Sequence, residues 1–288
     1  MATDVRIRPM HPAHVAAADL VAYDALQGAL PQLGETFEQR ARRGQSRVAH
    51  LLETDPGGAW VAESAEGRVV GVALALLREG LWGLSLLAVE PALQGNGIGR
   101  RLLDAALSYA DGARGAIILS STDPKAMRRY ARAGFALRPA VAAAGIVERA
   151  ALPPRHPAIR AATGDDLDLT EPVSRAVRGA THASDIPTAL AGGAELLVLG
   201  DRGFVVHCEG TPRLLAALDE EAAQALLGAA LAASSPGATV QVDFISARQD
   251  WAVAVALEAG LALSPDGPIF VRGDVGPLRP YLPSGAYL

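Results

Sequence analysis

The sequence predicts a mixed α+β protein with two tandem domains. The chain has 288 residues, which is about twice the usual size of one domain. A proline-rich stretch at residues 151–157 (ALPPRHP) separates two segments of similar length, as a linker does. Strand and helix patterns occur in both segments, and 50% of the residues are hydrophobic, enough for two cores. We therefore expect domains at residues 1–150 and 158–288, the second ending in a C-terminal tail.

The first half opens with a strand, two helices and three further strands. Apolar residues recur at helical spacing before residue 52, and the later apolar runs are separated by Glu66-Gly67 and Glu79-Gly80, which are typical turn sequences. This pattern predicts that the three later strands form a meander. The elements expected in order are a strand at 5–8, helices at 13–29 and 35–52, and strands at 60–63, 69–77 and 81–89.

The rest of the first half alternates helices with strands. Asp123 and Pro124 provide an N-cap side chain and a proline at the first helical position, which together predict the start of a helix. Glycines close both helices of this part. The elements expected are a helix between Gly99 and Gly112, a strand at 116–120, a helix ending at Gly134 and a strand beginning at Phe135.

The second half repeats part of the first in weakened form. The sequence AGFALRP at 133–139 recurs as AGLALSP at 259–265, and LLDAAL at 102–107 recurs as LLGAAL at 226–231. Two matches in the same order indicate a duplication. Chance is the alternative, because the alanine-rich composition makes short matches easy.

Charge and composition exclude several functional classes. The net charge is −5, with 17 Lys and Arg against 15 Asp and Glu in residues 1–150 and 9 against 16 in the rest. We therefore expect the first half to bind any anionic ligand. The net negative charge of the whole chain is untypical of a nucleic-acid-binding protein. No apolar run is long enough to cross a membrane and residues 1–14 show no signal peptide, so we expect a cytoplasmic protein that binds no membrane. With the single cysteine Cys208 and scattered histidines, neither a disulfide nor a metal site is expected.

Three alternating glycines follow the strand expected at 81–89. They lie in the sequence QGNGIG at 94–99, directly before a helix. Glycine lets successive N–H groups point at one anion, and the helix start adds positive charge. A dinucleotide-binding fold would need an acidic residue after the next strand, and a P-loop would need Gly-Lys-Ser/Thr. The chain has neither, since its only lysine is Lys125, so a different phosphate-binding loop is predicted, with a flexible turn as the alternative.

These residues resemble the GNAT superfamily of acetyl-CoA-dependent N-acetyltransferases. Its first motif reads Q/R-x-x-G-x-G/A after a strand, and its second reads N-x6-Y-x3-G-F. The resemblance implies two tandem GNAT-like domains, each a mixed central sheet flanked by helices, with the second a degenerate copy. The matching residues are Gln94, Gly97 and Gly99 in the first motif, and Asp123, in place of asparagine, Tyr130, Gly134 and Phe135 in the second.

The resemblance implies that acetyl-CoA is the acyl donor. Backbone N–H groups of the glycine loop would hold its pyrophosphate, and the preceding strand would offer main-chain groups to pantetheine and to the thioester carbonyl. Asp123 is also a helix N-cap, and an ionised aspartate cannot donate the hydrogen bond that asparagine can. The residues implied in cofactor binding are Leu87, Ala88, Val89, Gln94, Gly95, Asn96, Gly97, Ile98, Gly99, Arg100 and Asp123.

The resemblance also implies the chemistry. Tyr130 would donate a proton to the departing thiolate, because a phenol is protonated at neutral pH. Glu79 is the candidate base that deprotonates the amine, with Glu63 as the alternative. The function implied is direct attack by a primary amine of a small molecule or peptide in a ternary complex. A longer acyl group and a non-catalytic acetyl-CoA-binding regulatory module stay open, as do a monomer and a homodimer.

The second half lacks the features that carry this function. Aligning the two repeats puts Ala256 where Tyr130 stands, and the segment before the second helix is shorter and contains Asp219, Glu220 and Glu221. Carboxylates there would repel a pyrophosphate, so we expect one coenzyme A per chain. The tail at 279–288 holds two of the five tyrosines. We expect it to dock, either near the acceptor cleft or on its own domain.

Overall fold

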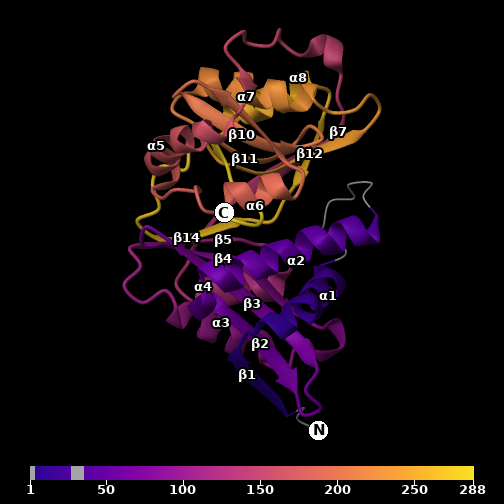
Figure 1. Cartoon of the computed structure of the whole chain (residues 1–288), viewed down its shortest axis with the longest axis vertical. Coiled ribbons are helices and arrows are strands. Elements are labelled where there is room, and N and C mark those ends of the chain that lie inside the picture. The colour runs from indigo at the N-terminus through magenta and orange to yellow at the C-terminus, as the bar shows by residue number, and fades with distance from the viewer. Residues whose placement is uncertain (1–3, 27–35) are drawn as a thin grey trace. The chain divides into compact units, whose positions relative to one another are not determined.

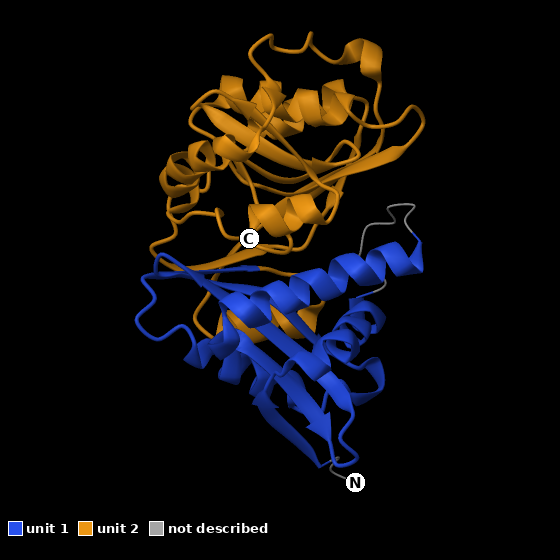
Figure 2. Ribbon diagram, in the orientation of Figure 1, with its two compact units in different colours: residues 1–118, 288 blue, residues 119–287 orange. Residues whose placement is uncertain are grey.

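The computed structural model describes residues 4–26 and 36–288 and divides the chain into two compact units (Figure 2). Unit 1 consists of the residues up to Ile118 together with Leu288, and unit 2 consists of residues 119–287. The end of the helix expected at 13–29 and the start of the helix expected at 35–52 fall outside the described residues.

Unit 1 is built on a mixed β-sheet. Its strands are β1 (Val5–Pro9), β2 (Ala59–Ser64), β3 (Val69–Arg78), β4 (Leu81–Val89) and β5 (Gly115–Leu119), in this spatial order. Neighbours are antiparallel except for β4 and β5, which run parallel. β3 and β4 are buried along almost their whole length, which explains their unbroken apolar sequences. The expected meander is confirmed, and β4 has the bounds that the sequence predicts.

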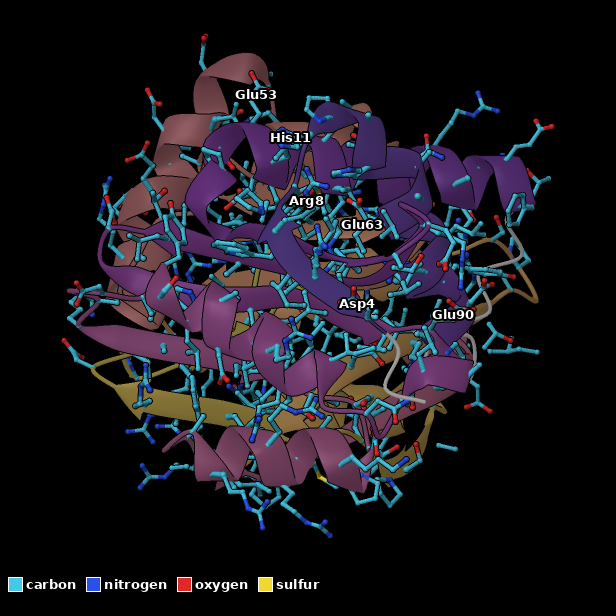
Figure 3. All side chains as sticks on the ribbon, turned by 90° about the horizontal axis from the view of Figure 1, so that it is seen from below. Asp4, Arg8, His11, Glu53, Glu63 and Glu90 are labelled. Carbon is cyan, nitrogen blue, oxygen red and sulfur yellow. The ribbon has the colours of Figure 1, made fainter. Side chains whose placement is uncertain are left out.

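The described residues of unit 1 form three α-helices, α1 (Val15–Leu26), α2 (Phe37–Thr54) and α3 (Ile98–Ser108). α1 and α2 lie on one face of the sheet and α3 lies on the other (Figures 1 and 3). α3 comes close to β3 because Gly71 has no side chain. A Cβ atom at Gly71 would lie 2.9 Å from Leu102 Cδ1 of α3.

Side-chain hydrogen bonds fix both ends of α2. At its start, the Gln39 N–H donates to Thr36 Oγ1 (3.2 Å) and the Thr36 N–H donates to Gln39 Oε1 (2.8 Å), which is a capping box. At its end, the buried carboxylate of Asp55 accepts from Arg78 Nη1 (2.7 Å) and from the Leu77 N–H (2.8 Å). The helix is thereby tied to the last residues of β3.

Unit 2 contains two further sheets, with strand orders β15-β11-β10-β9-β8 and β12-β7-β13, and within it β14 also pairs with β6. Its helices are α4 (Pro124–Arg132), α5 (Leu167–Arg178), α6 (Ile186–Ala191), α7 (Glu220–Ala232) and α8 (Asp250–Glu258). Its strands are β6 (Ala136–Arg138), β7 (Ala140–Ile146), β8 (Arg160–Ala161), β9 (Glu195–Leu199), β10 (Gly203–Cys208), β11 (Thr211–Ala217), β12 (Thr239–Ser246), β13 (Ala262–Pro265), β14 (Ile269–Gly273) and β15 (Tyr281–Leu282).

The two sequence halves share strands in unit 2. β7, from the first half, lies between β12 and β13 of the second half, and β6 pairs with β14. These pairings place residues 119–150 in the same compact unit as the second half. Because compactness here follows strand pairing rather than the position of a linker, the domain boundary at 151–157 stays a prediction.

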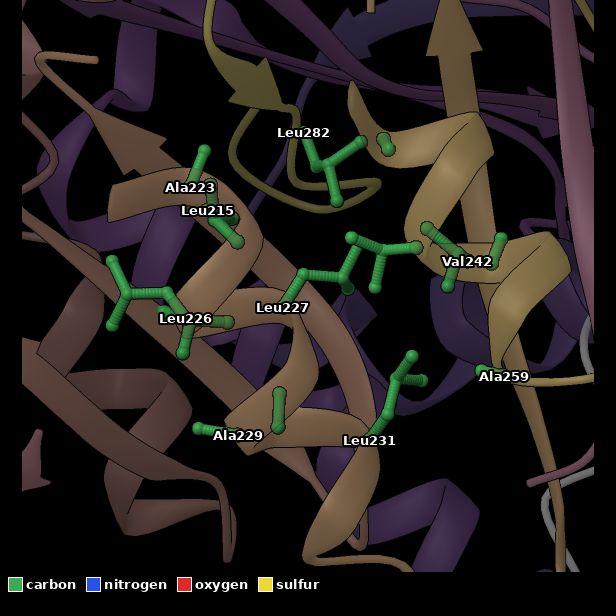
Figure 4. Packing of buried hydrophobic residues seen from close by; sticks show 14 of the residues in the cluster. Leu215, Ala223, Leu226, Leu227, Ala229, Leu231, Val242, Ala259 and Leu282 are labelled. Atoms are coloured by element: carbon green, nitrogen blue, oxygen red, sulfur yellow. The ribbon is translucent and has the colours of Figure 1, made fainter. Parts of the chain in front are cut away.

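The core of unit 2 surrounds α7 (Figure 4). This helix consists largely of alanine and leucine, and a helix that is apolar on nearly all sides is normally buried. Its residues Leu226, Leu227 and Leu231 are fully buried in one apolar cluster with Leu215 of β11 and Val242 of β12. The apolar repeat at 226–231 therefore supplies this core.

The C-terminal tail is packed against protein along most of its length. β15 pairs with β11, and the buried Tyr281 hydroxyl lies 3.0 Å from His182 Nε2. Arg178 Nη1 donates to the carbonyl oxygen of Tyr287 (2.8 Å). Leu288 belongs to unit 1. Its buried side chain fills the space beside Gly83 of β4 that a Cβ atom at this residue would need. The tail thus packs within unit 2 as far as Tyr287, and its last residue packs on β4.

We expect the buried Asp55–Arg78 ion pair to be a major contributor to the stability of unit 1. Asp55 is 1% exposed, so the substitution Asp55→Ala would leave the Arg78 guanidinium buried without this carboxylate. Breaking such a pair lowers the free energy of unfolding by about 3–5 kcal/mol. Urea unfolding of the full chain, followed by tryptophan fluorescence, measures the loss.

The matched control is Arg8→Met, which breaks the ion pair between Arg8 and Glu63 (2.9 Å; Figure 3). The Arg8 side chain is 49% exposed, and an exposed pair contributes less than about 1 kcal/mol. Equal losses in the two variants would contradict the role assigned to Asp55.

Candidate functional site

Strand β4 separates from β5 halfway along its length. Residues 81–84 of β4 pair with residues 115–118 of β5, and the pairing ends at Leu84 and Ile118. β4 continues to Val89 and stays paired with β3 on its opposite edge. In the part of the chain that the structure describes, no strand pairs with the outer edge of β4 beyond Leu84. A main-chain edge is thus left for an extended ligand, which can bind as an added strand does.

The main-chain groups on this edge follow from the pairing with β3. The N–H and C=O groups of alternate residues in a strand face opposite edges. The Glu90 N–H donates to the carbonyl oxygen of Val70 in β3 (2.9 Å). The polar main-chain groups of Ala88 therefore face β3, and those of Leu87 and Val89 face away from it. Of the three β4 residues expected to contact a ligand, Leu87 and Val89 have main-chain groups on the outer edge.

Ser85 forms a β-bulge at the point where β4 and β5 separate. Leu74 of β3 pairs with Leu86, and the next residue, Ala75, pairs with Leu84. Ser85 is therefore an extra residue between two paired positions. Such bulges are frequent next to active sites, where they change the direction of a strand or end its pairing.

The loop between β4 and α3 contains two glycines with positive φ angles. Gly95 and Gly97 have φ angles of 88° and 80°, in the left-handed region that glycine enters readily. A Cβ atom at either residue would meet nothing within 4 Å, so backbone conformation rather than space requires glycine. Residues 94–97 are exposed. Among the described residues, none accepts a hydrogen bond from the N–H groups of residues 95–98.

Two side chains of the loop hold its shape. Gln94 Nε2 donates to the Val89 carbonyl oxygen (3.1 Å), and Asn96 Nδ2 donates to the Leu93 carbonyl oxygen (3.2 Å). Both amide nitrogens are thus used inside the segment between β4 and α3. The main chain, rather than these side chains, supplies the donors for a ligand.

The first turn of α3 is suited to an anion. A helix N-terminus carries partial positive charge, and this turn contains no acidic residue. Arg100 is exposed, although its N–H already donates to the Gly97 carbonyl oxygen (3.2 Å). Arg101 Nη1 donates to the Val5 carbonyl oxygen (2.8 Å) and so connects α3 to β1. The donors for an anion are therefore the N–H groups of residues 95–98 and the Arg100 side chain.

Asp123 and Tyr130 belong to unit 2, at the start and near the end of α4. Asp123 Oδ1 accepts from the Lys125 N–H (2.9 Å), so the N-cap role of Asp123 is confirmed. Tyr130 is 5% exposed and packs edge-on against Phe270, with ring centroids 5.5 Å apart. Burial raises the pKa of Tyr130 to about 12, because it disfavours the charged phenolate. The hydroxyl therefore keeps its proton throughout the physiological range.

The two candidate bases lie at different places in unit 1. Glu79 is exposed at the tip of the β3–β4 hairpin, where Glu79 and Gly80 have φ angles of 47° and 79°, as in a type I′ turn. Glu63 lies on β2 and accepts from Arg8 Nη1 with both oxygens (3.0 and 2.9 Å). The Glu63 carboxylate is thus held in an ion pair, whereas Glu79 lies in the turn that leads into β4.

The helix that the sequence repeat aligns with α3 begins differently. Asp219 caps α7 by accepting from the Ala222 N–H (2.9 Å), and Arg202 Nη2 donates to Asp219 (2.7 Å) and to Glu221 (3.0 Å). The hydrogen bond from Arg202 lowers the pKa of Asp219, which keeps this carboxylate ionised. The start of α7 therefore carries its own anions, which repel a phosphate group.

Arg47 of α2 is a residue at the β4 edge that sequence reasoning missed. Its Nε and Nη2 donate to Ser85 Oγ (3.0 and 2.7 Å), and Nη2 also donates to the Ser85 carbonyl oxygen. A helical pattern does not show which strand residue an arginine contacts. The signal present in the sequence is Ser85 itself, a hydroxyl residue in the otherwise apolar strand LWGLSLLAV.

Comparisons with known proteins agree with the two sequence motifs. A family model described as the acetyltransferase (GNAT) family matches residues 23–135, which include β4, the glycine loop and Tyr130. No curated protein matches the chain. None of the described helices combines the length and apolar character needed to cross a membrane.

Solved structures share the fold at low sequence identity. A putative acetyltransferase from Pyrococcus horikoshii matches with a TM-score of 0.79 and 15% identity, over 99% of this chain and 96% of that chain. A GCN5-related N-acetyltransferase from Sphaerobacter thermophilus matches with a TM-score of 0.59 and 15% identity, over 99% and 100%. A tandem GNAT protein from the clavulanic acid biosynthesis pathway matches with a TM-score of 0.60 and 14% identity, over 94% and 98%.

These matches confirm the α+β fold class and the resemblance found in the sequence. Whether the second half is a degenerate copy stays a prediction. Through residues 23–135, the chain is similar to the GNAT acetyltransferase family.

Proposed function

We propose that this protein transfers an acetyl group from acetyl-CoA to a primary amine of a small molecule or peptide. One observation carries the proposal: β4 continues beyond its pairing with β5 and leads directly into an exposed loop at the start of α3, where the N–H groups of residues 95–98 have no acceptor among the described residues. Acetyl-CoA contains an extended chain with amide groups, followed by a diphosphate. The edge of β4 suits the amide groups, and the loop that follows it suits the diphosphate. The amine attacks the donor directly in a ternary complex.

The residues of unit 1 fit coenzyme A. The N–H groups of residues 95–98, together with the Arg100 side chain, would bind the pyrophosphate. The outward main-chain groups of Leu87 and Val89 would pair with the pantetheine amides. Gln94 would support both by holding the end of β4. The contact between Asp123 and the donor, which the family resemblance implies, stays a prediction.

The same edge would stabilise the charge that develops during transfer. Bound acetyl-CoA supplies a thioester carbonyl, and its C–S bond breaks as the C–N bond to the amine forms. The outward N–H of Leu87, beyond the bulge at Ser85, is the proposed hydrogen-bond donor to the carbonyl oxygen. A donor of this kind contributes roughly 3–4 kcal/mol where measured.

Tyr130 is the proposed acid, and Glu79 is the proposed base. Tyr130 holds the place of the tyrosine in the second motif, and its raised pKa keeps the hydroxyl protonated for donation to the departing thiolate. Glu79 would take the proton from the amine. The support for Glu79 is the position of its exposed carboxylate in the turn that leads into β4.

We expect Gly97→Ala to abolish most of the affinity for coenzyme A. Alanine is disfavoured at a φ of 80°, by about 1–2 kcal/mol, so the loop would turn its N–H groups away from the pyrophosphate. Isothermal titration of the wild-type chain should give one coenzyme A per chain. The variant should bind at least about tenfold more weakly, a loss of about 1.4 kcal/mol.

Gly112→Ala is the matched control for Gly97→Ala. Gly112 follows α3, is exposed and has a φ of 75°, and a Cβ atom at this residue would also meet nothing within 4 Å. The two variants should lose similar thermal stability, and the control should keep its affinity for coenzyme A. Two equivalent sites in the wild type, or equal losses of affinity in the two variants, would contradict the proposed loop function.

We expect Tyr130→Phe to lower kcat by about 10²-fold or more while coenzyme A binding is retained, because positioned acids contribute 10²–10⁴-fold. Since the pKa of Tyr130 is about 12, the acid stays protonated as pH rises. The wild-type rate should therefore increase as the amine loses its proton and should show no fall up to about pH 10. Release of coenzyme A thiol measures the rate.

The control for Tyr130→Phe is Tyr109→Phe. Burial, followed by the charge of Asp55, also raises the pKa of Tyr109 to about 12, and its hydroxyl donates to Asp55 Oδ1 (3.1 Å). This variant should lose stability but keep its turnover per folded molecule. A non-catalytic binding module would bind coenzyme A and show no turnover in any variant.

We expect Glu79→Gln to lower kcat by about 10²-fold at neutral pH, because an amide cannot accept the proton of the amine. Glu66→Gln is the control, since Glu66 also precedes a glycine in an exposed hairpin turn. The pH–rate profile of both variants is the measurement. If the profile of Glu79→Gln coincides with that of the wild type, Glu79 is not the base.

A further inference from the structure

We propose that the edge of β11 in unit 2 is a binding site for an extended peptide, and that the C-terminal segment of the chain is its ligand. This segment, residues 279–288, takes on β11 the edge positions that acetyl-CoA takes on β4 in the proposed function. The proposal rests on the proposed acetyl transfer, because it compares the two edges. The segment is thus a built-in substitute for the acyl donor in unit 2.

The first step is the equivalence of β4 and β11. The strands β8, β9, β10 and β11 are antiparallel neighbours in this order, as are β1, β2, β3 and β4. In each case the fourth strand leads into a helix, α3 after β4 and α7 after β11. The two helices carry the sequences LLDAAL and LLGAAL, which the sequence repeat aligns. β11 therefore holds the place in unit 2 that β4 holds in unit 1.

The second step is a β-bulge that the two strands share. Val206 and His207 are neighbours in β10, but their partners in β11 are Leu214 and Pro212. Arg213 is therefore an extra residue between two paired positions, as one residue is in β4. The two strands have the same irregularity as well as the same place among their neighbours.

The bulges align the two strands residue by residue. Each strand ends four residues beyond its extra residue. Leu215 therefore corresponds to Leu87, and Ala217 corresponds to Val89. Since the main-chain groups of Leu87 and Val89 face away from β3, we expect those of Leu215 and Ala217 to face away from β10.

The third step is that the C-terminal segment binds these outward groups. The Ala217 N–H donates to the carbonyl oxygen of Pro280 (3.3 Å). β15 runs antiparallel to β11, with Leu282 opposite Leu215. Alternate residues of a strand face the same edge, so Leu215 faces the segment as Ala217 does. The segment is therefore added to the edge of β11 in the way that a peptide ligand is added to a sheet.

The side chains of β15 are bound on both faces of the sheet. Leu282 is 3% exposed and belongs to the apolar cluster around α7 (Figure 4). Its neighbour Tyr281 points to the opposite face, where its hydroxyl lies 3.0 Å from His182 Nε2. The Tyr281 N–H donates to Gln249 Oε1 (3.3 Å), and Gln249 Nε2 donates to the Leu278 carbonyl oxygen (2.7 Å). Main-chain pairing together with sites for alternate side chains is typical of peptide recognition at a sheet edge.

The consequence is that unit 2 binds its own segment where unit 1 would bind the acyl donor. Leu215 and Ala217 are fully buried, and β15 lies on their outward edge. The amides of an acyl donor therefore have no access to this edge while the segment is bound. A ligand that is tethered to its site has an effective concentration in the millimolar range, so the segment stays bound in the wild type.

The test uses the full chain and a synthetic peptide of residues 279–288 with a fluorescent label at its N-terminus. In the tail variant, Tyr281→Ala and Leu282→Ala are combined, which weakens the resident segment, and Tyr281→Phe removes only a hydroxyl. The control is Leu263→Ala, because Leu263 of β13 is an apolar residue of unit 2 that is 40% exposed. The measurements are fluorescence anisotropy of the peptide, hydrogen exchange of single amides in β11, and the number of coenzyme A molecules bound per chain.

The tail variant should bind one peptide per chain, whereas the wild type and Leu263→Ala should bind none, because their own segment occupies the site. N-methylation of Leu282 in the peptide removes the N–H that pairs with β11, and it should weaken binding at least about tenfold. All chains should bind one coenzyme A.

Hydrogen exchange should separate the two edges of β11. In the tail variant, the amides of Leu215 and Ala217 should exchange at least about tenfold faster than in the wild type, and added peptide should restore their protection. The amide of Ala216 faces β10 and should change by less than about twofold, a difference too small to mark a lost hydrogen bond. Tyr281→Phe should show the same pattern with a smaller effect.

Several results would overturn the proposal. Equal acceleration of all three amides would mark a general loosening of unit 2 rather than release of one edge. Failure of the tail variant to bind the peptide, or binding that N-methylation leaves unchanged, would contradict a site for an added strand. Concentration-dependent dimers that exchange labelled tails would make a second copy, rather than the chain itself, the source of the ligand.

Two further outcomes are distinguishable. If the tail variant does not fold, the exchange pattern of Tyr281→Phe decides by the same criterion. If the wild type neither binds coenzyme A nor transfers acetyl groups, the proposed function fails. Peptide binding and hydrogen exchange then still decide whether β11 binds the C-terminal segment.

Discussion

A buried strand that leaves its neighbour has to find new partners for its peptide groups, and this constraint shapes the site in unit 1. β4 keeps β3 on one edge along its whole length but loses β5 after Leu84. At the point of separation, Arg47 donates hydrogen bonds to the carbonyl oxygen and to Oγ of Ser85, which forms the bulge. Further along, the main-chain groups of Leu87 and Val89 face away from β3. The separation of the two strands therefore removes main-chain hydrogen bonds between β4 and β5, and it also leaves the edge of β4 that the proposed function requires.

The loop after β4 follows the same principle. Its donors belong to the main chain, and glycine is needed where φ is positive at Gly95 and Gly97. The side-chain amides of Gln94 and Asn96 donate hydrogen bonds to neighbouring carbonyl groups. These hydrogen bonds hold the loop in shape before any ligand binds. In the proposed role, a loop that is already held in shape loses less conformational entropy on binding an anion than a flexible loop would.

The two sequence halves differ at the helix starts that the sequence repeat aligns. α3 begins with a glycine N-cap and no acidic residue, whereas α7 begins at Asp219 with an ion pair to Arg202. Both arrangements satisfy a helix N-terminus, one by leaving donors for a ligand and the other by supplying an internal carboxylate. In the second arrangement, the carboxylates at the start of α7 would repel a phosphate group. The halves nevertheless remain connected in folding, because β7 completes a sheet between β12 and β13.

The sequence by itself determined the features that depend on local order. The strand at 81–89, the capping of α4 by Asp123 and the glycine loop before α3 follow from periodicity, N-cap chemistry and positive φ, which neighbouring residues dictate. Only the tertiary structure decided where β4 leaves β5, which strands the halves share, and that Arg47 binds Ser85. These features join residues far apart in the chain, and the packing that selects them leaves no periodic trace in the sequence.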